Sequence, residues 1–130
     1  MAQSNLLGFS AAGFVAGGTI PVNTMVKLDT TAGQVVVTTA ITEVPFGAAM
    51  TSAVSGGTVK VQTHGIAKVT ASGIIALGAQ VVASTDGKVE TFTGIGATAY
   101  SCGVALTAAA AAGDVIEVML ATPPVAGPTN

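Results

Sequence analysis

The chain repeats its own residue pattern after about 55 positions, and this repeat constrains the fold more than any other feature of the sequence. Three positions of the first half return at offsets of 55 (75 − 20), 55 (81 − 26) and 54 (87 − 33): Ile20 as Ile75, Val26 as Val81 and Gly33 as Gly87. Two glycines return at offsets of 56 (103 − 47) and 57 (113 − 56): Gly47 as Gly103 and Gly56 as Gly113. A duplicated β unit with small changes in loop length would give this slow drift, and two copies are too few for a solenoid. The repeat predicts one pseudo-symmetric fold.

Short runs of Val, Ile and Thr, separated by glycine-containing turns, follow one another through residues 19–121. Such regular spacing is typical of a sandwich or a barrel. The predicted strands are Met25–Leu28, 34–39, 46–51, Thr58–Gln62, 66–69, Gln80–Ala83, 88–93, 101–107 and 115–120. We therefore expect an all-β, single-domain β-sandwich or barrel-like fold, with pseudo-repeats over 19–70 and 71–121.

One strand and one turn carry specific expectations. The alternation in Thr58–Gln62 predicts that Val59 and Val61 face inward while Lys60 and Gln62 face outward. Asp86-Gly87 is a strong hairpin signal, because a type I′ turn needs positive φ at both central positions.

The alanine run at 107–112 is the one segment that argues against an all-β chain. Alanine is the best helix former, but five alanines followed by Gly113 are too few to nucleate a stable helix. We expect a connecting loop there, or one helical turn.

The two ends of the chain are predicted to lie outside the β domain. Residues 1–18 show neither a helical nor a period-2 pattern, which predicts an irregular N-terminal arm with four apolar anchors: Leu6, Leu7, Phe9 and Phe14. Residues 122–130 contain Pro123-Pro124 and Pro128. Because proline cannot serve a central strand, we expect a flexible, extended C-terminal tail.

Charged side chains are scarce. The sequence has four Lys, no Arg and six acidic residues, a net charge of −2, and 8% charged residues, whereas about 25% is usual in a soluble domain. This charge disfavours binding to nucleic acid or to an anionic membrane. No stretch reads as a transmembrane helix or a signal peptide. A surface with so little charge must carry Ser and Thr hydroxyls or be covered by partners.

Side chains that could perform chemistry are few. His64, the single histidine, stands between two predicted strands without a partner for base catalysis or metal binding. Cys102 takes the repeat position of Phe46, which indicates packing. The six carboxylates fall at turns or alternate with apolar neighbours, and the glycines match no phosphate loop. We predict that the chain is not an enzyme and has no catalytic, cofactor-binding or metal-binding residues.

The repeated pieces also carry a resemblance to a known family. In the first half they are 18–28, Gly33-Gln34-Val35, Phe46-Gly47-Ala48-Ala49, 56–61 and His64-Gly65-Ile66-Ala67. In the second they are 73–83, Asp86-Gly87-Lys88-Val89, Cys102-Gly103-Val104-Ala105 and 113–118. Over about residues 18–121 the chain resembles the small decoration (cement, or head-stabilising) proteins of tailed-phage capsids, and more specifically the DUF2190-like group of capsid accessory proteins.

The resemblance implies a structural protein that binds the outer surface of a viral capsid and cements neighbouring major coat subunits. It implies the major capsid protein as partner and a homo-oligomer, preferably a trimer, located in the virion after synthesis in the host cytoplasm. It brings no cofactor. Leu6, Leu7, Phe9 and Phe14 become candidate capsid or subunit contacts, and capping of the domain's own core is the equal alternative for them.

The alternative function is a carbohydrate-binding or adhesive β module of a fibre or surface structure. Sugar platforms use exposed aromatic side chains, and Phe92 and Tyr100 are the candidates for that role.

Overall fold

The computed structural model describes residues 11–40, 43–92 and 100–126, with the side chains of 13–40, 43–92 and 101–120. Its strands are β1 (Ala11–Ala16), β2 (Met25–Leu28), β3 (Gln34–Val37), β4 (Gly47–Ala49), β5 (Thr58–Gln62), β6 (Gly65–Thr70), β7 (Gln80–Ala83), β8 (Val89–Thr91), β9 (Tyr100–Ala105) and β10 (Val115–Ala126). A tight turn, η2 (Thr85–Gly87), connects β7 to β8. Nothing in the described ranges forms a helix that could span a membrane. The predicted all-β fold is confirmed, and the alanine run forms a loop, not a helical turn.

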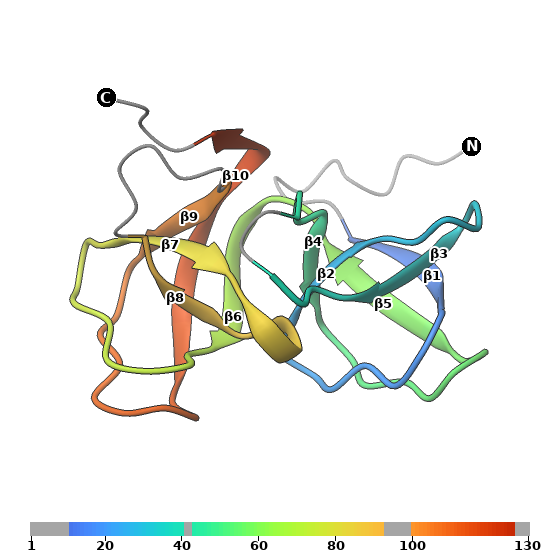
Figure 1. Cartoon of the computed structure of the whole chain (residues 1–130), viewed down its shortest axis with the longest axis horizontal. Helices are drawn as coiled ribbons and strands as arrows, with labels where there is room; N and C mark the ends of the chain where they lie inside the picture. Colours follow the sequence, from blue (N-terminus) through green and yellow to red (C-terminus); the bar gives the residue numbers. More distant parts are fainter. Residues whose placement is uncertain (1–10, 41–42, 93–99, 127–130) are drawn as a thin grey trace.

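The strands of the first half close into a barrel in the order β1-β3-β2-β4-β5, the blue-to-green body on the right of Figure 1. Strand β1 closes it by pairing antiparallel with β5 and parallel with β3. Val59 and Val61 are buried and Lys60 is exposed, as the alternation predicts. The fold of this half is therefore a barrel.

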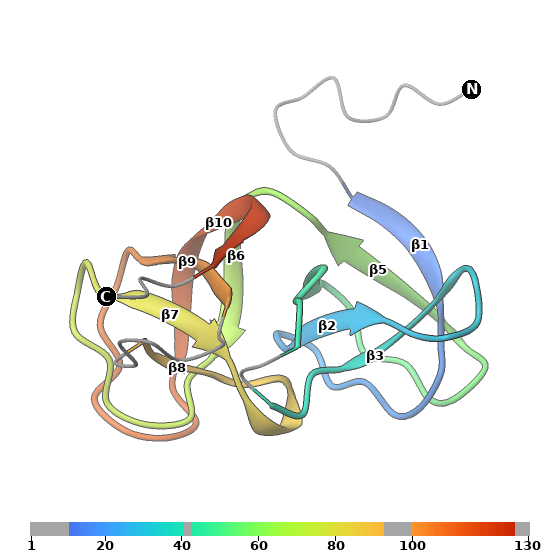
Figure 2. The same ribbon diagram turned by 45° about the horizontal axis from the view of Figure 1, so that its top comes forward.

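The strands of the second half pair in the same cyclic order. Their sheet reads β6-β10-β9-β7-β8, which is the barrel order with β6 to β10 in the places of β1 to β5. Its last gap, between β8 and β6, is bridged by the parallel pair Ala71↔Val89, at the place where the first barrel has Ala16↔Val35. The two bodies lie side by side in Figures 1 and 2.

Individual backbone hydrogen bonds recur as well. The exchange between Ile20 and Ala53 returns between Ile75 and Ala109, and the bond from Met50 to Lys60 returns from Leu106 to Glu117. The two halves therefore share these pairings, with β6 in the place of β1.

The core consists of small β-branched and alanine side chains. Ile20 and Ile75, at equivalent positions, are both fully buried in their respective halves. The cluster of the second half also contains Met25 and Ala48 from the first barrel. The two halves therefore pack against each other through shared apolar side chains.

A turn of the second half locks against the first barrel. Asp86 and Gly87 both have positive φ (57° and 70°), and the N–H of Lys88 donates to the carbonyl of Thr85 at 3.1 Å, so the predicted type I′ turn is confirmed. The N–H of Gly87 then donates to the Thr38 carbonyl at 3.0 Å, and the Thr38 hydroxyl donates to the carbonyl of Ser84 at 2.9 Å. In Figure 1 this yellow turn points toward β2 and β3.

The prediction of an irregular arm over 1–18 is wrong for Ala11–Ala16, which form β1. Alternation is present there, with Ala16 buried and Gly13 and Val15 exposed, but small side chains hide it in the sequence. Alanine and glycine have low strand propensity, so this strand depends on pairing with β5 and β3.

Two further expectations are corrected. Gln62 is buried, not exposed, because its amide donates to the carbonyls of His64 and Ile66 at the crossing between the halves. The predicted tail is part of β10 as far as Ala126, where Val125 pairs with Ser101 and Ala126 with Tyr100. Pro123-Pro124 fall in the register shift between Leu120 and Val125, where a missing N–H interrupts no ladder pair.

Replacing Gly87 by alanine should destabilise the protein by about 3 kcal/mol, the sum of backbone strain and overpacking. The new Cβ would lie 2.7 Å from the Thr24 Cβ and 2.8 Å from the Met25 carbonyl oxygen. Gly33→Ala is the matched control, because it has φ of 81° but no atom within 4 Å, and should lose only about 1 kcal/mol. Urea unfolding measures both variants. Equal losses would contradict the close seating of the η2 turn.

Candidate interaction surface

Four loops gather at one end of the molecule, which we call the loop end. They are 17–24 and 50–57 from the first half and 71–79 and 106–114 from the second. In Figures 1 and 2 the loops 17–24 and 50–57 lie along the lower side, and the loops 71–79 and 106–114 reach that side from the left flank, whereas β1 begins and β10 ends at the upper side. One face of the protein is therefore built from equivalent loops of the two halves.

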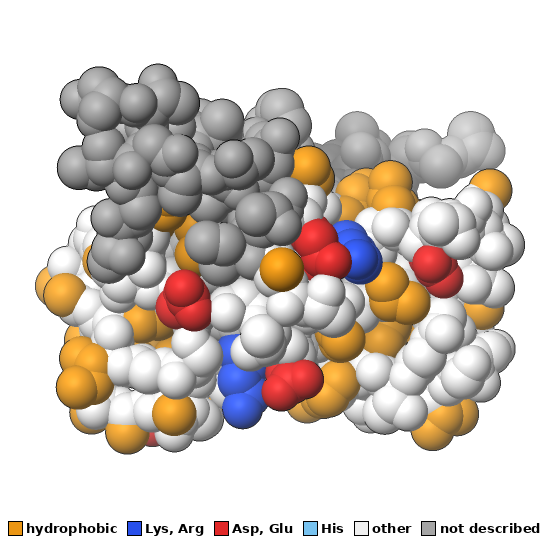
Figure 3. Space-filling view, viewed as in Figure 1, with side chains coloured by type: hydrophobic (Ala, Val, Ile, Leu, Met, Phe, Trp, Pro, Cys, Tyr) orange, Lys and Arg blue, Asp and Glu red, His pale blue; other side chains and the backbone are white. Residues whose placement is uncertain are grey.

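The loop end exposes the most accessible large apolar side chains among the described residues. Ile74 is 77% exposed, Val54 70% and Leu77 69%, and Val22 in the loop 17–24 is 44% exposed. Figure 3 shows hydrophobic side chains at both lower corners of the molecule. Exposed apolar side chains at two separate places on this end make it a candidate interaction surface.

The loops are held in pairs by hydrogen bonds. Ile20 and Ala53 exchange two backbone bonds of 2.8 and 2.9 Å, and Ile75 and Ala109 exchange two of 3.0 and 2.9 Å. The buried Ile20 and Ile75 side chains anchor each pair to a core. The apolar tips are therefore presented on preorganised backbone, which lowers the entropy lost on binding.

Charge is almost absent from the loop end. Asp114 is the one charged residue in the four loops, and its Oδ2 accepts from the N–H groups of Ala110 and Ala111 at 2.9 and 3.2 Å. The Asp114 carboxylate thus accepts hydrogen bonds within its own turn. A partner of this end would meet neutral, largely apolar surface.

A second apolar area lies on the outer face of β6, β10 and β9. Ile66 pairs with Met119, which pairs with Val104, and all three are exposed. Beside them, residues of both halves line a hollow of about 270 Å³: Asn23, Ala48, Ala49, Met50, Gln62, Ile66, Ala67 and Lys68. Lys68 and Glu117 also face each other across this sheet, so this area, unlike the loop end, mixes charge with apolar surface.

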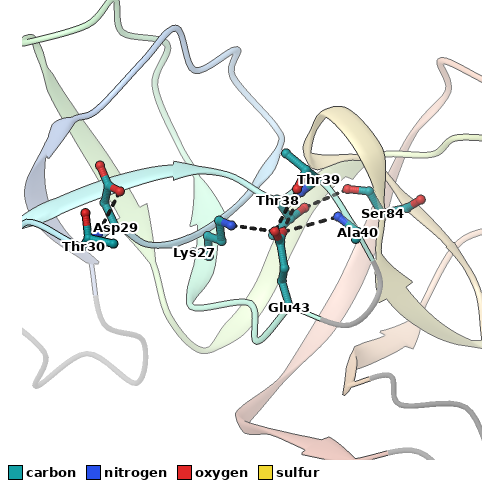
Figure 4. A network of polar contacts seen from close by, with 8 residues as sticks. All are labelled: Lys27, Asp29, Thr30, Thr38, Thr39, Ala40, Glu43 and Ser84. Atoms are coloured by element: carbon teal, nitrogen blue, oxygen red, sulfur yellow. Dashed lines mark hydrogen bonds and ion pairs between the residues drawn. The ribbon is translucent and has the colours of Figure 1, made fainter.

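A network of polar contacts ties the β3–β4 connection to β2 (Figure 4). The Glu43 carboxylate accepts from Lys27 Nζ at 2.6 Å, from the hydroxyl and N–H of Thr39 at 2.7 Å each, and from the Ala40 N–H at 3.3 Å. Burial raises the pKa of Glu43, but the hydrogen bonds from Lys27, Thr39 and Ala40 together outweigh it and bring the pKa from 4.5 to about 2. This network has a structural role, since each of these hydrogen bonds to the Glu43 carboxylate comes from another residue of the same chain.

Of the four proposed arm contacts, the structure describes only Phe14. Leu6, Leu7 and Phe9 lie outside the described residues. Phe14 is half-buried against the core of the first barrel, with its ring edge-on to Phe46 at 5.1 Å between centroids. Phe14 therefore anchors β1 to its own domain.

The other candidates from the sequence are not brought together into a reactive site. Cys102 is buried, and burial raises its pKa to about 12, which removes the thiolate that a nucleophile needs. His64 is half-buried with Nδ1 3.4 Å from the Thr63 hydroxyl. Among the described residues no group of three or more His, Cys, Asp or Glu could hold a metal ion. Phe92 is half-buried, and the side chain of Tyr100 lies outside the described ones.

Sequence reasoning missed the loop end. The signal was available, because the inter-strand segments combine apolar residues with glycine and alanine and lack charge. Loops are normally polar, so Val54, Ile74 and Leu77 at turns are unusual. Their common side could be found only once the strand order was known.

Glu43→Gln should remove part of the acid sensitivity of the fold. Because the pKa of Glu43 is depressed on folding, its stabilisation is fully present above pH 4.5 and is lost as pH falls toward 2. Thermal unfolding of wild type and variant should differ more at pH 6 than at pH 2.5. Glu117→Gln, which removes an exposed carboxylate, controls for net charge. A difference independent of pH would contradict the role of this network.

The family model described as phage cement protein matches residues 6–120. Among solved structures, the chain is similar to the N base of the head fibre gp8.5 of bacteriophage phi29, with a TM-score of 0.69 and 13% identity, over 92% of this chain and 99% of that one; at this identity the likeness shows a shared fold. No curated protein matches. The family match covers most of the sequence, and the chain belongs to the phage cement protein family, a family of bacteriophage structural proteins.

Proposed function

We propose that this protein binds the outer surface of a phage capsid and cements neighbouring major coat subunits. The observation that carries the proposal is the match to the phage cement family over residues 6–120. The charge-poor surface supports it, because a chain that spends its life covered by partners needs few charges to stay dispersed. The protein acts in the virion, after synthesis in the host cytoplasm.

Its action is mechanical and not catalytic. A standard interface buries about 1,200–2,000 Å² in total, and apolar burial contributes about 25 cal/mol per Å² before the entropy of association is subtracted. A ligand that binds the assembled shell and not the free subunits stabilises the shell by mass action. A modest affinity per copy, repeated over the shell, raises its resistance to rupture.

The same proposal includes a homo-oligomer, with a trimer preferred from the family resemblance. The exposed row of Ile66, Met119 and Val104 offers apolar surface to a second copy. Leu6, Leu7 and Phe9 remain candidate capsid or subunit contacts.

Purified protein added to empty shells of its own phage should bind at a copy number that is a simple fraction of the coat subunits. The shells should then rupture at a higher temperature, because the bound state stabilises them. Sedimentation with quantitative mass spectrometry gives the copy ratio, and light scattering on heating gives the rupture temperature. Binding of a few copies per shell would instead favour the adhesive module of a fibre, and no binding would overturn the proposal.

Removal of residues 1–10 tests the arm without touching the barrel. Because Ala11–Ala16 form β1, a truncation must stop before Ala11 to preserve the fold. If Leu6, Leu7 and Phe9 contact the shell, the shortened protein should unfold at the wild-type urea midpoint but bind shells at least about 10-fold more weakly, the loss of a few buried apolar side chains. The control is Leu6→Ala/Leu7→Ala/Phe9→Ala in the full chain. Wild-type shell binding by both would remove the arm from the contact.

A further inference from the structure

We infer that the loop end holds two similar docking sites, one from each half, and that they grip two neighbouring coat subunits at once. The inference rests on the proposed function and deepens it, since it names the face and the manner of attachment. The first site is the loop pair 17–24 with 50–57, and the second is the pair 71–79 with 106–114.

The two sites are equivalent in backbone construction. Each is held by a two-bond exchange at the same place, Ile20 with Ala53 and Ile75 with Ala109. Each presents exposed apolar side chains, Val22 and Val54 in the first and Ile74 and Leu77 in the second. In Figures 1 and 2 the first pair lies along the lower side, and the second pair reaches that side from the left flank. One chain therefore carries the same kind of contact twice, on adjoining parts of its surface.

The chemistry of the loop end selects the partner. A charged partner surface would lose its hydration against these loops without gaining a counter-charge, which is unfavourable. The partner surface must then be neutral and largely apolar. A lipid surface fits less well, because the loops contain neither basic residues nor the Trp and Tyr that sit at membrane interfaces.

β1 begins and β10 ends at the side opposite the loop end (Figure 1). A shell offers what two equivalent sites need, because neighbouring copies of one coat protein repeat the same surface at a fixed spacing.

Two linked contacts bind far more tightly than one. Linking two sites raises avidity by about 100- to 10,000-fold over a single contact when geometry allows both to engage. A single coat subunit can occupy one site only. The arrangement thus favours assembled shell over free coat protein, which is the preference that a cement needs.

The test uses Val54→Asp for the first site and Ile74→Asp for the second, each placing a charge on a side chain that is at least 70% exposed. On empty shells, each variant should bind about 100-fold more weakly than wild type, and the double variant should show no measurable binding. On unassembled coat subunits, wild type and single variants should bind within about threefold of one another, because one site suffices. Leu28→Asp, on exposed β2 surface outside the loop end, is the matched control and should bind shells as wild type does. Urea midpoints confirm that all variants fold.

The outcomes separate the inference from the function it rests on. If wild type does not bind shells, the proposed function fails. If wild type binds and only one single variant is weakened, or neither, the function stands and the two-site inference is overturned. Native mass spectrometry provides a further check, since a smaller oligomer in Val54→Asp or Ile74→Asp would assign the loop end to contact between copies of this chain and overturn the inference.

Discussion

The arrangement of this protein depends on the seating of the η2 turn against the first barrel. The N–H of Gly87 donates to the carbonyl of Thr38, and the hydroxyl of Thr38 donates to the carbonyl of Ser84. A Cβ at Gly87 would collide with Thr24. Shared packing of Met25 and Ala48 in the core of the second half completes the junction. Because these contacts set the two halves against each other, they also decide that both pairs of loops reach the same end of the molecule.

The side chains of the core explain why the loops are so well held. Valine, isoleucine and alanine fill two small bodies that contain no tryptophan. With little volume to pack, each body relies on closed or nearly closed strand ladders, which leave few backbone groups unpaired. The bridges Ile20↔Ala53 and Ile75↔Ala109 extend this pairing into the loops. The strand ladders therefore hold the exposed loops in place without large core side chains.

Much of the candidate surface could not be predicted by reading the sequence in order. The prediction concentrated on Leu6, Leu7, Phe9 and Phe14, because large apolar residues near a chain end suggest an anchoring arm. Phe14 packs on Phe46 instead. Val54, Ile74 and Leu77 stand in short loops, and the end of the molecule that they share depends on strand pairings between residues far apart in the chain. Gln62 was misplaced for the same reason, since its partners belong to the next strand.

The sequence by itself determined the all-β class, the positions of most strands, the type I′ turn at Asp86-Gly87 and the absence of a motif for chemistry. These properties follow from local periodicity, turn geometry and composition, which act over a few residues. Only the tertiary structure decided that the first half closes into a barrel through β1, that β10 continues past its prolines, and that four charge-poor loops reach one end. These features come from pairing and packing between distant segments, where small residues such as those of Ala11–Ala16 take their conformation from their neighbours.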